Sequence, residues 1–184
     1  MRYLKQGFAK LCAGLAILSL SACVSITATD HPTDAQVHAP LTVFLVRHAE
    51  KMSGPDPVLT ADGSVRADDL ADLLIDANID RIHSSDYKRT RQTAAPLAER
   101  LGVDVELYDP RDLAGMAAQL KADGGRHLVV GHSNTTGELT EFLGGEGGAP
   151  IVEATEYDRL YVVTIGADGG VDSTLLRFGE TSPR

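Results

Sequence analysis

Apolar and polar positions along the chain form blocks that predict strands and helices in turn. Residues 41–46, LTVFLV, are a nearly unbroken apolar run, which is typical of a strand buried on both faces. From residue 60 to residue 77 the apolar positions recur at helical spacing, with Thr60 as the expected N-cap. The same alternation predicts further strands at 79–83, 103–108 and 126–131, further helices at 86–101, 111–122 and 134–143, and a last pair of strands at 158–165 and 171–178.

Four strand–helix repeats followed by two strands predict an α/β fold. We expect a three-layer sandwich with a mostly parallel central sheet, helices on both faces and a C-terminal antiparallel hairpin that turns at 167–170. These elements make up one domain, residues 41–184. In such sheets ligands bind beyond the carboxyl ends of the strands, so the chemistry is expected there.

Polar residues next to these elements predict where two of the helices begin. Ser85 or Asp86 is expected to cap the helix at 86–101, and Gly102 to end it. Ser133 and Asn134 are suited to cap the helix at 134–143.

The first 22 residues follow a different pattern. Basic residues precede an apolar run at 11–20, and small residues then lead to Cys23. This order is typical of an export signal, and the apolar run is too short to span a bilayer comfortably. Residues 20–23, Leu-Ser-Ala-Cys, resemble the bacterial lipobox. The resemblance implies that residues 1–22 are a lipoprotein signal peptide and that Cys23 is lipidated. Ordinary secretion with cleavage nearby, or a signal anchor, is the alternative.

Residues 23–40 have no apolar periodicity, so after the lipidated cysteine we predict a flexible tether. Residue 24 is Val rather than Asp, which in the bacterial sorting rule that this segment resembles favours the outer membrane. The resemblance therefore implies a lipid-anchored protein at the periplasmic face of a bacterial cell envelope, which contacts the membrane through its N-terminal lipid only.

Charge and composition exclude several classes of protein. The 184 residues include 17 Lys and Arg against 26 Asp and Glu, and this acidic balance argues against a nucleic-acid partner, which requires a basic face. No run of 18 apolar residues occurs, which excludes a multi-pass membrane protein. Two cysteines can form neither a disulfide-rich scaffold nor a thiolate zinc site.

Histidines and arginines stand where three of the predicted strands end. Arg47 and His48 follow the first strand, Arg89 lies in the first turn after the second, and His132 follows the fourth. Guanidinium groups bind phosphate oxygens bidentately, helix N-termini add backbone N–H groups, and histidine can attack phosphorus. The set therefore predicts a phosphate site. Arg91 is about 200° around the helix from Arg89, so both cannot face one pocket.

Four motifs in this order resemble those of the histidine phosphatase superfamily, also called the phosphoglycerate mutase-like family. They are the RHA at 47–49, the LTxxG at 59–63, the SSDxxRTRQTA at 84–94 and the VVGHSN at 129–134.

The resemblance implies a role for each cationic residue. His48 becomes phosphorylated, Arg47 and Arg89 bind the phosphoryl group, and His132 hydrogen-bonds that group and stabilises charge in the transition state. The attacking nitrogen of His48 must be unprotonated, with the hydrogen of the other nitrogen held by a backbone carbonyl or a similar partner. The implied activity is metal-independent hydrolysis, without a cofactor, of a phosphorylated small molecule or a phosphoprotein.

The general acid is not fixed by the motifs. Ser133 follows His132, so the acidic residue that acid phosphatases have there is absent. Asp109, at the end of the third strand, is the first candidate, Asp112 the second and Glu50 the third.

Two other functions stay open from the sequence. One is a phosphomutase of the same family, and the other is a non-catalytic envelope lipoprotein that binds an anionic ligand in the same pocket. Substrate specificity is predicted to depend on residues 50–58 and on the loop at 144–157.

Overall fold

The computed structural model describes residues 39–182. The predicted signal peptide at 1–22, the lipidated Cys23 and the tether up to residue 38 lie outside the described residues, so these predictions stay predictions.

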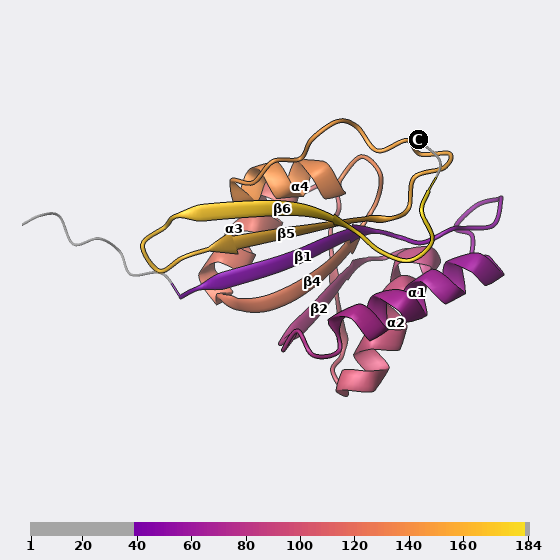
Figure 1. Ribbon diagram of the computed structural model, residues 1–184, viewed down its shortest axis with the longest axis horizontal. Coiled ribbons are helices and arrows are strands. Elements are labelled where there is room, and N and C mark those ends of the chain that lie inside the picture. Colours follow the sequence, from indigo (N-terminus) through magenta and orange to yellow (C-terminus); the bar gives the residue numbers. More distant parts are fainter. Residues whose placement is uncertain (1–38, 183–184) are drawn as a thin grey trace, which may run out of the picture. The chain divides into compact units, whose positions relative to one another are not determined.

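Strands and helices alternate as the sequence predicts (Figure 1). In chain order the elements are β1 (Leu41–Arg47), α1 (Ala61–Leu74), β2 (Arg81–Ser85), α2 (Lys88–Leu101), β3 (Val105–Tyr108), α3 (Leu113–Asp123), β4 (Gly125–Gly131), α4 (Thr136–Leu143), β5 (Arg159–Ile165) and β6 (Val171–Arg177).

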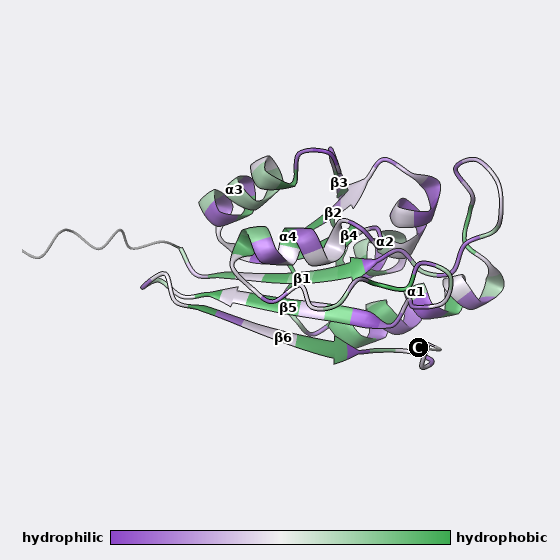
Figure 2. Ribbon diagram, turned by 90° about the horizontal axis from the view of Figure 1, so that it is seen from above, coloured by the Kyte–Doolittle hydropathy of each residue, from purple (hydrophilic) through white to green (hydrophobic). Residues whose placement is uncertain are grey.

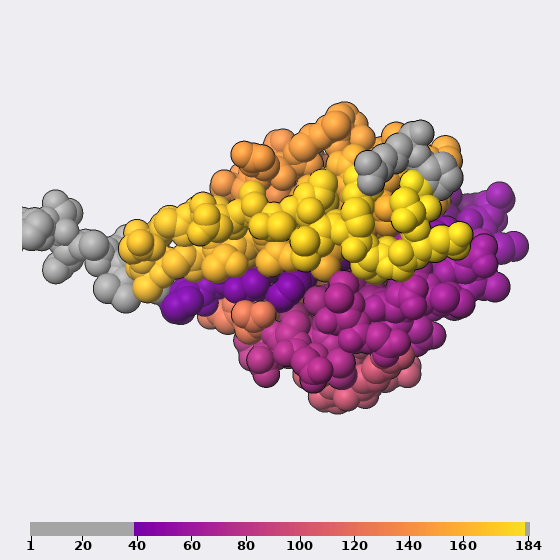
Figure 3. All heavy atoms as spheres, in the orientation of Figure 1, coloured from indigo at the N-terminus to yellow at the C-terminus, as the bar shows by residue number. Residues whose placement is uncertain are grey.

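The strands form one six-stranded sheet in the order β3-β2-β4-β1-β5-β6. Strands β1 to β4 are parallel to one another, β5 runs antiparallel to β1, and β6 runs antiparallel to β5. The predicted α/β fold with a mostly parallel sheet and a C-terminal antiparallel hairpin is confirmed. Figure 3 shows the C-terminal residues, in yellow, running across the face of the domain that is turned to the viewer.

Two apolar cores lie on opposite faces of the sheet because side chains alternate along β1. Leu41, Val43 and Leu45 pack with residues of α3 and α4, whereas Phe44 and Val46 pack with residues of α1 and α2. β1 is therefore buried on both faces, as its apolar run predicts, and Figure 2 shows its hydrophobic colouring along most of its length. Among residues 39–182 no helix combines enough length with enough apolar character to cross a membrane.

Two predicted helix boundaries are confirmed. Thr60 caps α1, and its hydroxyl accepts a 3.0 Å hydrogen bond from the backbone N–H of Gly63. Gly102 ends α2 in the left-handed conformation, at a φ of 68°.

The predicted caps of α2 and α4 are wrong. The N-cap of α2 is Tyr87, because the hydroxyl of Ser85 bonds to His132 and Asp86 pairs with Arg91. The N-cap of α4 is Thr135 rather than Ser133 or Asn134. Its hydroxyl accepts a hydrogen bond from the backbone N–H of His132. The hydroxyls of Ser85 and Thr135, which stand just before these helices, therefore bond to His132 and do not cap the helix N-terminus.

Candidate active site

The register of the two central strands brings the predicted histidines together. Arg47 at the end of β1 pairs with Gly131 at the end of β4. The backbone N–H of His48 donates to the carbonyl of Gly131 over 2.9 Å, so His48 and His132 leave the sheet side by side. Their ring centroids are 5.5 Å apart with an edge-on geometry.

His48 is held with one nitrogen available for attack. Its Nδ1 lies 2.7 Å from the carbonyl oxygen of Ala49. Because a carbonyl only accepts, Nδ1 carries the hydrogen and Nε2 carries the lone pair. Burial first, and then the nearby positive charge of Arg47 and Arg89, lower the pKa of His48 to about 3, although the hydrogen bond to the Ala49 carbonyl acts in the opposite direction. The ring is therefore neutral at pH 7, as a nucleophile toward phosphorus must be.

Both ring nitrogens of His132 are engaged. The Arg89 guanidinium lies 3.3 Å from Nδ1, and the Ser85 hydroxyl lies 2.8 Å from Nε2. Because a guanidinium only donates, Nδ1 accepts and Nε2–H donates to Ser85. The Ser85 hydroxyl in turn donates to Thr90 over 3.2 Å. Burial first, and then the two arginines, lower the pKa of His132 to about 4, so this ring is neutral as well.

Arg89 lies over the pocket, at the start of α2. Its guanidinium stacks on the Tyr87 ring at 4.5 Å, and its Nε–H is buried without a hydrogen-bond partner among residues 39–182. Arg91, two positions later, turns outward and pairs with Asp86 over 2.5 Å. The helical geometry thus selects Arg89, as the sequence predicts.

Arg47 occupies a different place from the one that a simple phosphate contact requires. Its terminal nitrogens donate to the backbone carbonyls of Glu153 at 2.7 Å and Glu156 at 2.8 Å, and its guanidinium lies 4.0 Å from the centre of the Tyr157 ring. The side chain is buried and does not line the pocket that holds His48. Only its Nε–H has no partner in the described part of the chain. Arg47 therefore anchors the loop before β5, and at most Nε is left for an anion.

The LTxxG motif positions the segment that follows His48. The carbonyl of Glu50 accepts a 2.9 Å hydrogen bond from the backbone N–H of Thr60. At Gly63 a Cβ atom would stand 2.1 Å from that same carbonyl oxygen. Only glycine allows helix α1 to approach the Glu50 backbone this closely, which explains why the motif contains it.

These side chains line a pocket of about 350 Å³. Residues that surround it include His48, Tyr87, Arg89, Arg111, His132 and Glu153. The cationic set predicted from three strand ends is therefore brought together, except for the terminal nitrogens of Arg47.

The structure places none of the three predicted acids in this pocket. The Asp109 carboxylate is exposed and accepts from the Arg111 guanidinium over 2.9 Å, which lowers the pKa of Asp109 and weakens it as a proton donor. Asp112 caps α3 by accepting from the backbone N–H of Gly115 over 2.9 Å. Glu50 forms a bidentate ion pair with Arg66.

Glu153 is the carboxylate that lines the pocket, and the sequence reasoning missed it as a candidate acid. It lies in the loop at 144–157, which was predicted only to affect specificity. No motif marks Glu153, since the signal is a long-range contact between this loop and Arg47.

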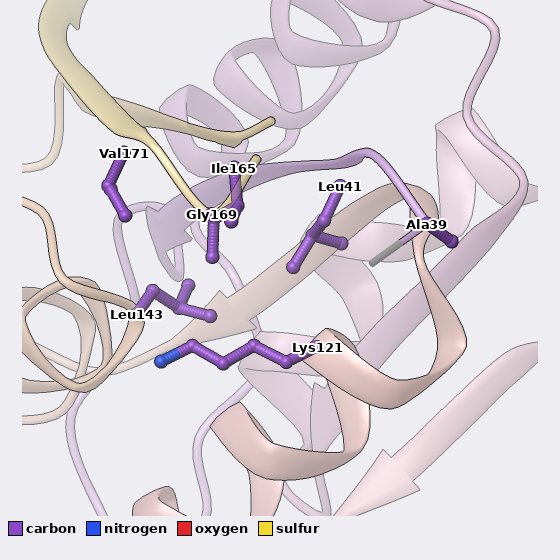
Figure 4. Close-up of a pocket in the computed structure, with 7 residues that line it drawn as sticks. All are labelled: Ala39, Leu41, Lys121, Leu143, Ile165, Gly169 and Val171. Carbon is purple, nitrogen blue, oxygen red and sulfur yellow. The ribbon is translucent and has the colours of Figure 1, made fainter. Parts of the chain in front are cut away.

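Two other features lie apart from this pocket. His83 and His127 are buried on β2 and β4, with Nε2 and Nδ1 2.9 Å apart. A mainly apolar pocket of about 200 Å³ lies at the opposite end of the sheet, where Leu41, Ile165 and Val171 surround it and Lys121 extends along one side (Figure 4). Within residues 39–182 no group of three or more His, Cys, Asp or Glu residues is arranged to hold a metal ion.

Comparison with known sequences supports the superfamily that the motifs resemble. Residues 43–111 match the family model described as histidine phosphatase superfamily, branch 1. A curated relative, described as a probable phosphoglycerate mutase (GpmB) of Escherichia fergusonii, is 40% identical over 79 residues, which cover 39% of this chain and 36% of the relative. The match therefore spans only about a third of the length of that relative.

Solved structures share the fold. The protein histidine phosphatase SixA complexed with tungstate superposes with a TM-score of 0.59 at 18% identity, covering 74% of this chain and 97% of that one. A phosphoglycerate mutase from Bacillus anthracis str. Sterne superposes with a TM-score of 0.59 at 16% identity, over 77% and 94% of the two chains. A putative phosphohistidine phosphatase SixA from Agrobacterium tumefaciens gives 0.55 at 24% identity, over 76% and 97%. At these identities the likeness establishes the fold alone.

Proposed function

We propose that this chain hydrolyses phosphomonoesters or phosphorylated protein side chains through a phosphohistidine on His48. The observation that carries the proposal is the orientation of His48, whose Nδ1–H is held by the Ala49 carbonyl while Nε2 is left as a nucleophile. The match of residues 43–111 to the histidine phosphatase superfamily supports the same chemistry.

The groups around His48 suit the charge of a phosphoryl group. Arg89 and Arg47 each have a buried Nε–H without a partner among the described residues, and a buried donor of this kind is stabilised by an anionic acceptor. Arg89 and His132 lie beside each other on the same wall of the pocket. Phosphoryl transfer depends mainly on positioning and on neutralising negative charge, and these residues supply both. The proposed reaction therefore needs neither a metal nor a cofactor.

The reaction proceeds in two displacements. With a phosphomonoester, the Nε2 lone pair of His48 attacks phosphorus, the P–O bond to the leaving group breaks, and an alcohol departs once its oxygen is protonated. Water then attacks the phosphohistidine, the P–N bond breaks, and inorganic phosphate leaves with His48 restored.

The test is phosphatase activity of the full chain and of His48→Ala, measured on an aryl phosphate and on a phosphohistidine-containing protein. We expect turnover and a trapped phosphohistidine with the wild type, and neither with His48→Ala. Far-ultraviolet circular dichroism verifies that the variant is folded. Equal activity of the two proteins would refute the proposal.

A phosphomutase is the second candidate, because the curated relative is described as a probable phosphoglycerate mutase. Transfer of label from the phosphoenzyme to a second substrate alcohol, rather than to water, would identify a mutase. Phosphate binding without any turnover or phosphohistidine would instead identify the non-catalytic binding protein.

We also propose that Cys23 is lipidated and that the enzyme is anchored at the periplasmic face of a bacterial envelope, on the outer membrane. The support is the lipobox-like sequence at 20–23 with Val at residue 24. Metabolic labelling with palmitate tests this proposal. Labelled wild type and unlabelled Cys23→Ser are expected, and fractionation of the two membranes distinguishes outer from inner.

A further inference from the structure

Neither histidine of the site can protonate a leaving group. His48 uses its hydrogen on the Ala49 carbonyl, and His132 uses its hydrogen on the Ser85 hydroxyl. Both rings are neutral at pH 7 because burial lowers their pKa values, to about 3 and about 4. An alkoxide leaves with difficulty unless it receives a proton as the P–O bond breaks. The site therefore needs a further acid.

The three carboxylates predicted from the sequence as general acids are engaged elsewhere. Asp109 accepts three hydrogen bonds from Arg111 and does not line the pocket, Asp112 caps α3, and Glu50 is paired with Arg66. A carboxylate held by a guanidinium favours its ionised form, which is the wrong form for a proton donor.

Glu153 differs from these three carboxylates both in its place and in its contacts. It lines the pocket together with His48 and His132, and among residues 39–182 no hydrogen bond or ion pair engages its carboxylate. The charge of Glu153 opposes the burial that lowers the pKa of Arg47, which shows that its carboxylate lies within electrostatic range of the residue preceding the nucleophile.

The backbone around Glu153 is fixed. Arg47 donates to the carbonyls of Glu153 and Glu156, as described above. The Glu156 carboxylate accepts from the backbone N–H of Val152 over 3.0 Å and pairs with Arg159 over 2.7 Å. The loop is thus closed on itself and tied to the strand that carries His48. A side chain on such a loop keeps its place relative to the nucleophile.

We infer that Glu153 is the general acid of the phosphatase, an inference that rests on the proposed function. In the first displacement the His48 Nε2–P bond forms, the P–O bond breaks, and the Glu153 carboxyl gives its proton to the departing oxygen. In the second displacement the Glu153 carboxylate takes a proton from water as the water oxygen attacks phosphorus, and the P–N bond breaks. Glu153 then holds its proton again, and the products are an alcohol and inorganic phosphate.

The charge of the substrate supports this cycle. A bound phosphate ester places negative charge beside Glu153, and a like charge favours the protonated carboxyl. Formation of the alcohol and loss of that proton then leave an anionic base beside the phosphohistidine, where water must be activated.

The experiment compares leaving groups with Glu153→Gln in the full chain. Nitrophenyl phosphate has a leaving group that departs without protonation, whereas glycerol phosphate has one that requires it. Single-turnover release of the alcohol isolates the first displacement. We expect Glu153→Gln to slow this release by about 10²-fold or more with glycerol phosphate, and by less than about tenfold with nitrophenyl phosphate.

The second displacement gives a separate readout. Without a base for water, Glu153→Gln should release one equivalent of nitrophenol in a burst and then accumulate phosphohistidine. Glu153→Asp should recover part of the rate with glycerol phosphate. Glu146→Gln is the matched control, since it removes an exposed carboxylate from the same loop outside the pocket and should leave both substrates unaffected.

Three results would overturn the inference while leaving the proposed function intact. They are unchanged rates in Glu153→Gln, an equal loss with both substrates, and a leaving-group-dependent loss in Asp109→Asn instead. Absence of turnover and of phosphohistidine in the wild type would instead refute the proposed function, and this inference with it.

Discussion

The Nε2 atom of His132 and the Oγ atom of Ser85 lie 2.8 Å apart, so one hydrogen bond joins the ends of the neighbouring strands β4 and β2. The Arg89 guanidinium, which only donates, fixes the tautomer of His132, and the bond to Ser85 fixes the angle of the ring. The serine of the SSD motif is therefore a positioning residue.

Replacing Ser85 with Ala should lower kcat/KM on an aryl phosphate by about tenfold, which corresponds to the loss of one buried hydrogen bond. The Nε2–H group of His132 would lose its acceptor, and the ring would no longer be held at its angle. Steady-state kinetics measure the effect. Ser84→Ala is the control, because it removes an equally buried hydroxyl from the opposite face of β2 and should change stability without a comparable change in activity.

Arg89→Ala should reduce kcat/KM by about 10²- to 10³-fold, because it removes donors aimed at the phosphoryl oxygens from a buried site. The affinity for inorganic phosphate, measured by calorimetry, should fall as well. Arg91→Ala removes the same charge from the outer side of the helix and should stay within about twofold of the wild type. Similar losses in both variants would show that only the overall charge matters.

Gly63→Ala should destabilise the domain by about 1–3 kcal/mol, because the new methyl group overlaps the Glu50 carbonyl. The segment that follows His48 must then shift, so activity should fall even at temperatures where the variant is folded. Urea unfolding and kinetics measure the two effects. Ser64→Ala, at the next and exposed position of α1, should change stability by less than about 0.5 kcal/mol. A larger loss of stability there would mean that any substitution in this turn of α1 destabilises the domain, whether or not it contacts Glu50.

His48 should stay neutral from pH 8 down to pH 5, because burial lowers its pKa to about 3 from an ordinary value of 6.5. Nitrogen-detected NMR of the imidazoles in the free protein tests this directly, and an inflection for His48 near pH 6.5 would contradict it. The nucleophile is lost only as pH falls through the folded-state pKa.

The same shift affects stability in a defined direction. Below pH 6.5 the unfolded chain takes up a proton at His48 that the folded protein does not bind, so the free energy of unfolding should decrease as the pH is lowered toward 3. Urea midpoints at a series of pH values measure this loss, and His48→Gln should show a weaker dependence on pH. An equal dependence in the two proteins would assign the effect to other groups.

The sequence predicts the fold and the cationic part of the site because both depend on local patterns. The run at 41–46, the cap at Thr60 and the glycine at 102 are each recognisable within a few residues. The parallel sheet then brings His48 and His132 to one edge without further information.

The parts that the sequence does not predict depend on contacts between distant segments. Ser85 is a residue type that often caps helices, but its hydroxyl forms a hydrogen bond with His132, 47 residues away. Glu153 is recognisable only once Arg47, 106 residues earlier, is seen to hold its carbonyl. Asp109 follows a strand end as predicted, yet its carboxylate pairs with its neighbour Arg111 and does not line the pocket.

The bonds from Arg47 end on backbone carbonyls, and every amino acid provides one of these. The side chains of Val152, Ala154 and Thr155 can therefore be exchanged without loosening the attachment of the loop to the strand that precedes the nucleophile. Substrate preference can in this sense be altered while His48 and Glu153 stay unchanged. A library randomised at Val152, Ala154 and Thr155 offers a route to new phosphatase specificities on an unchanged reaction centre.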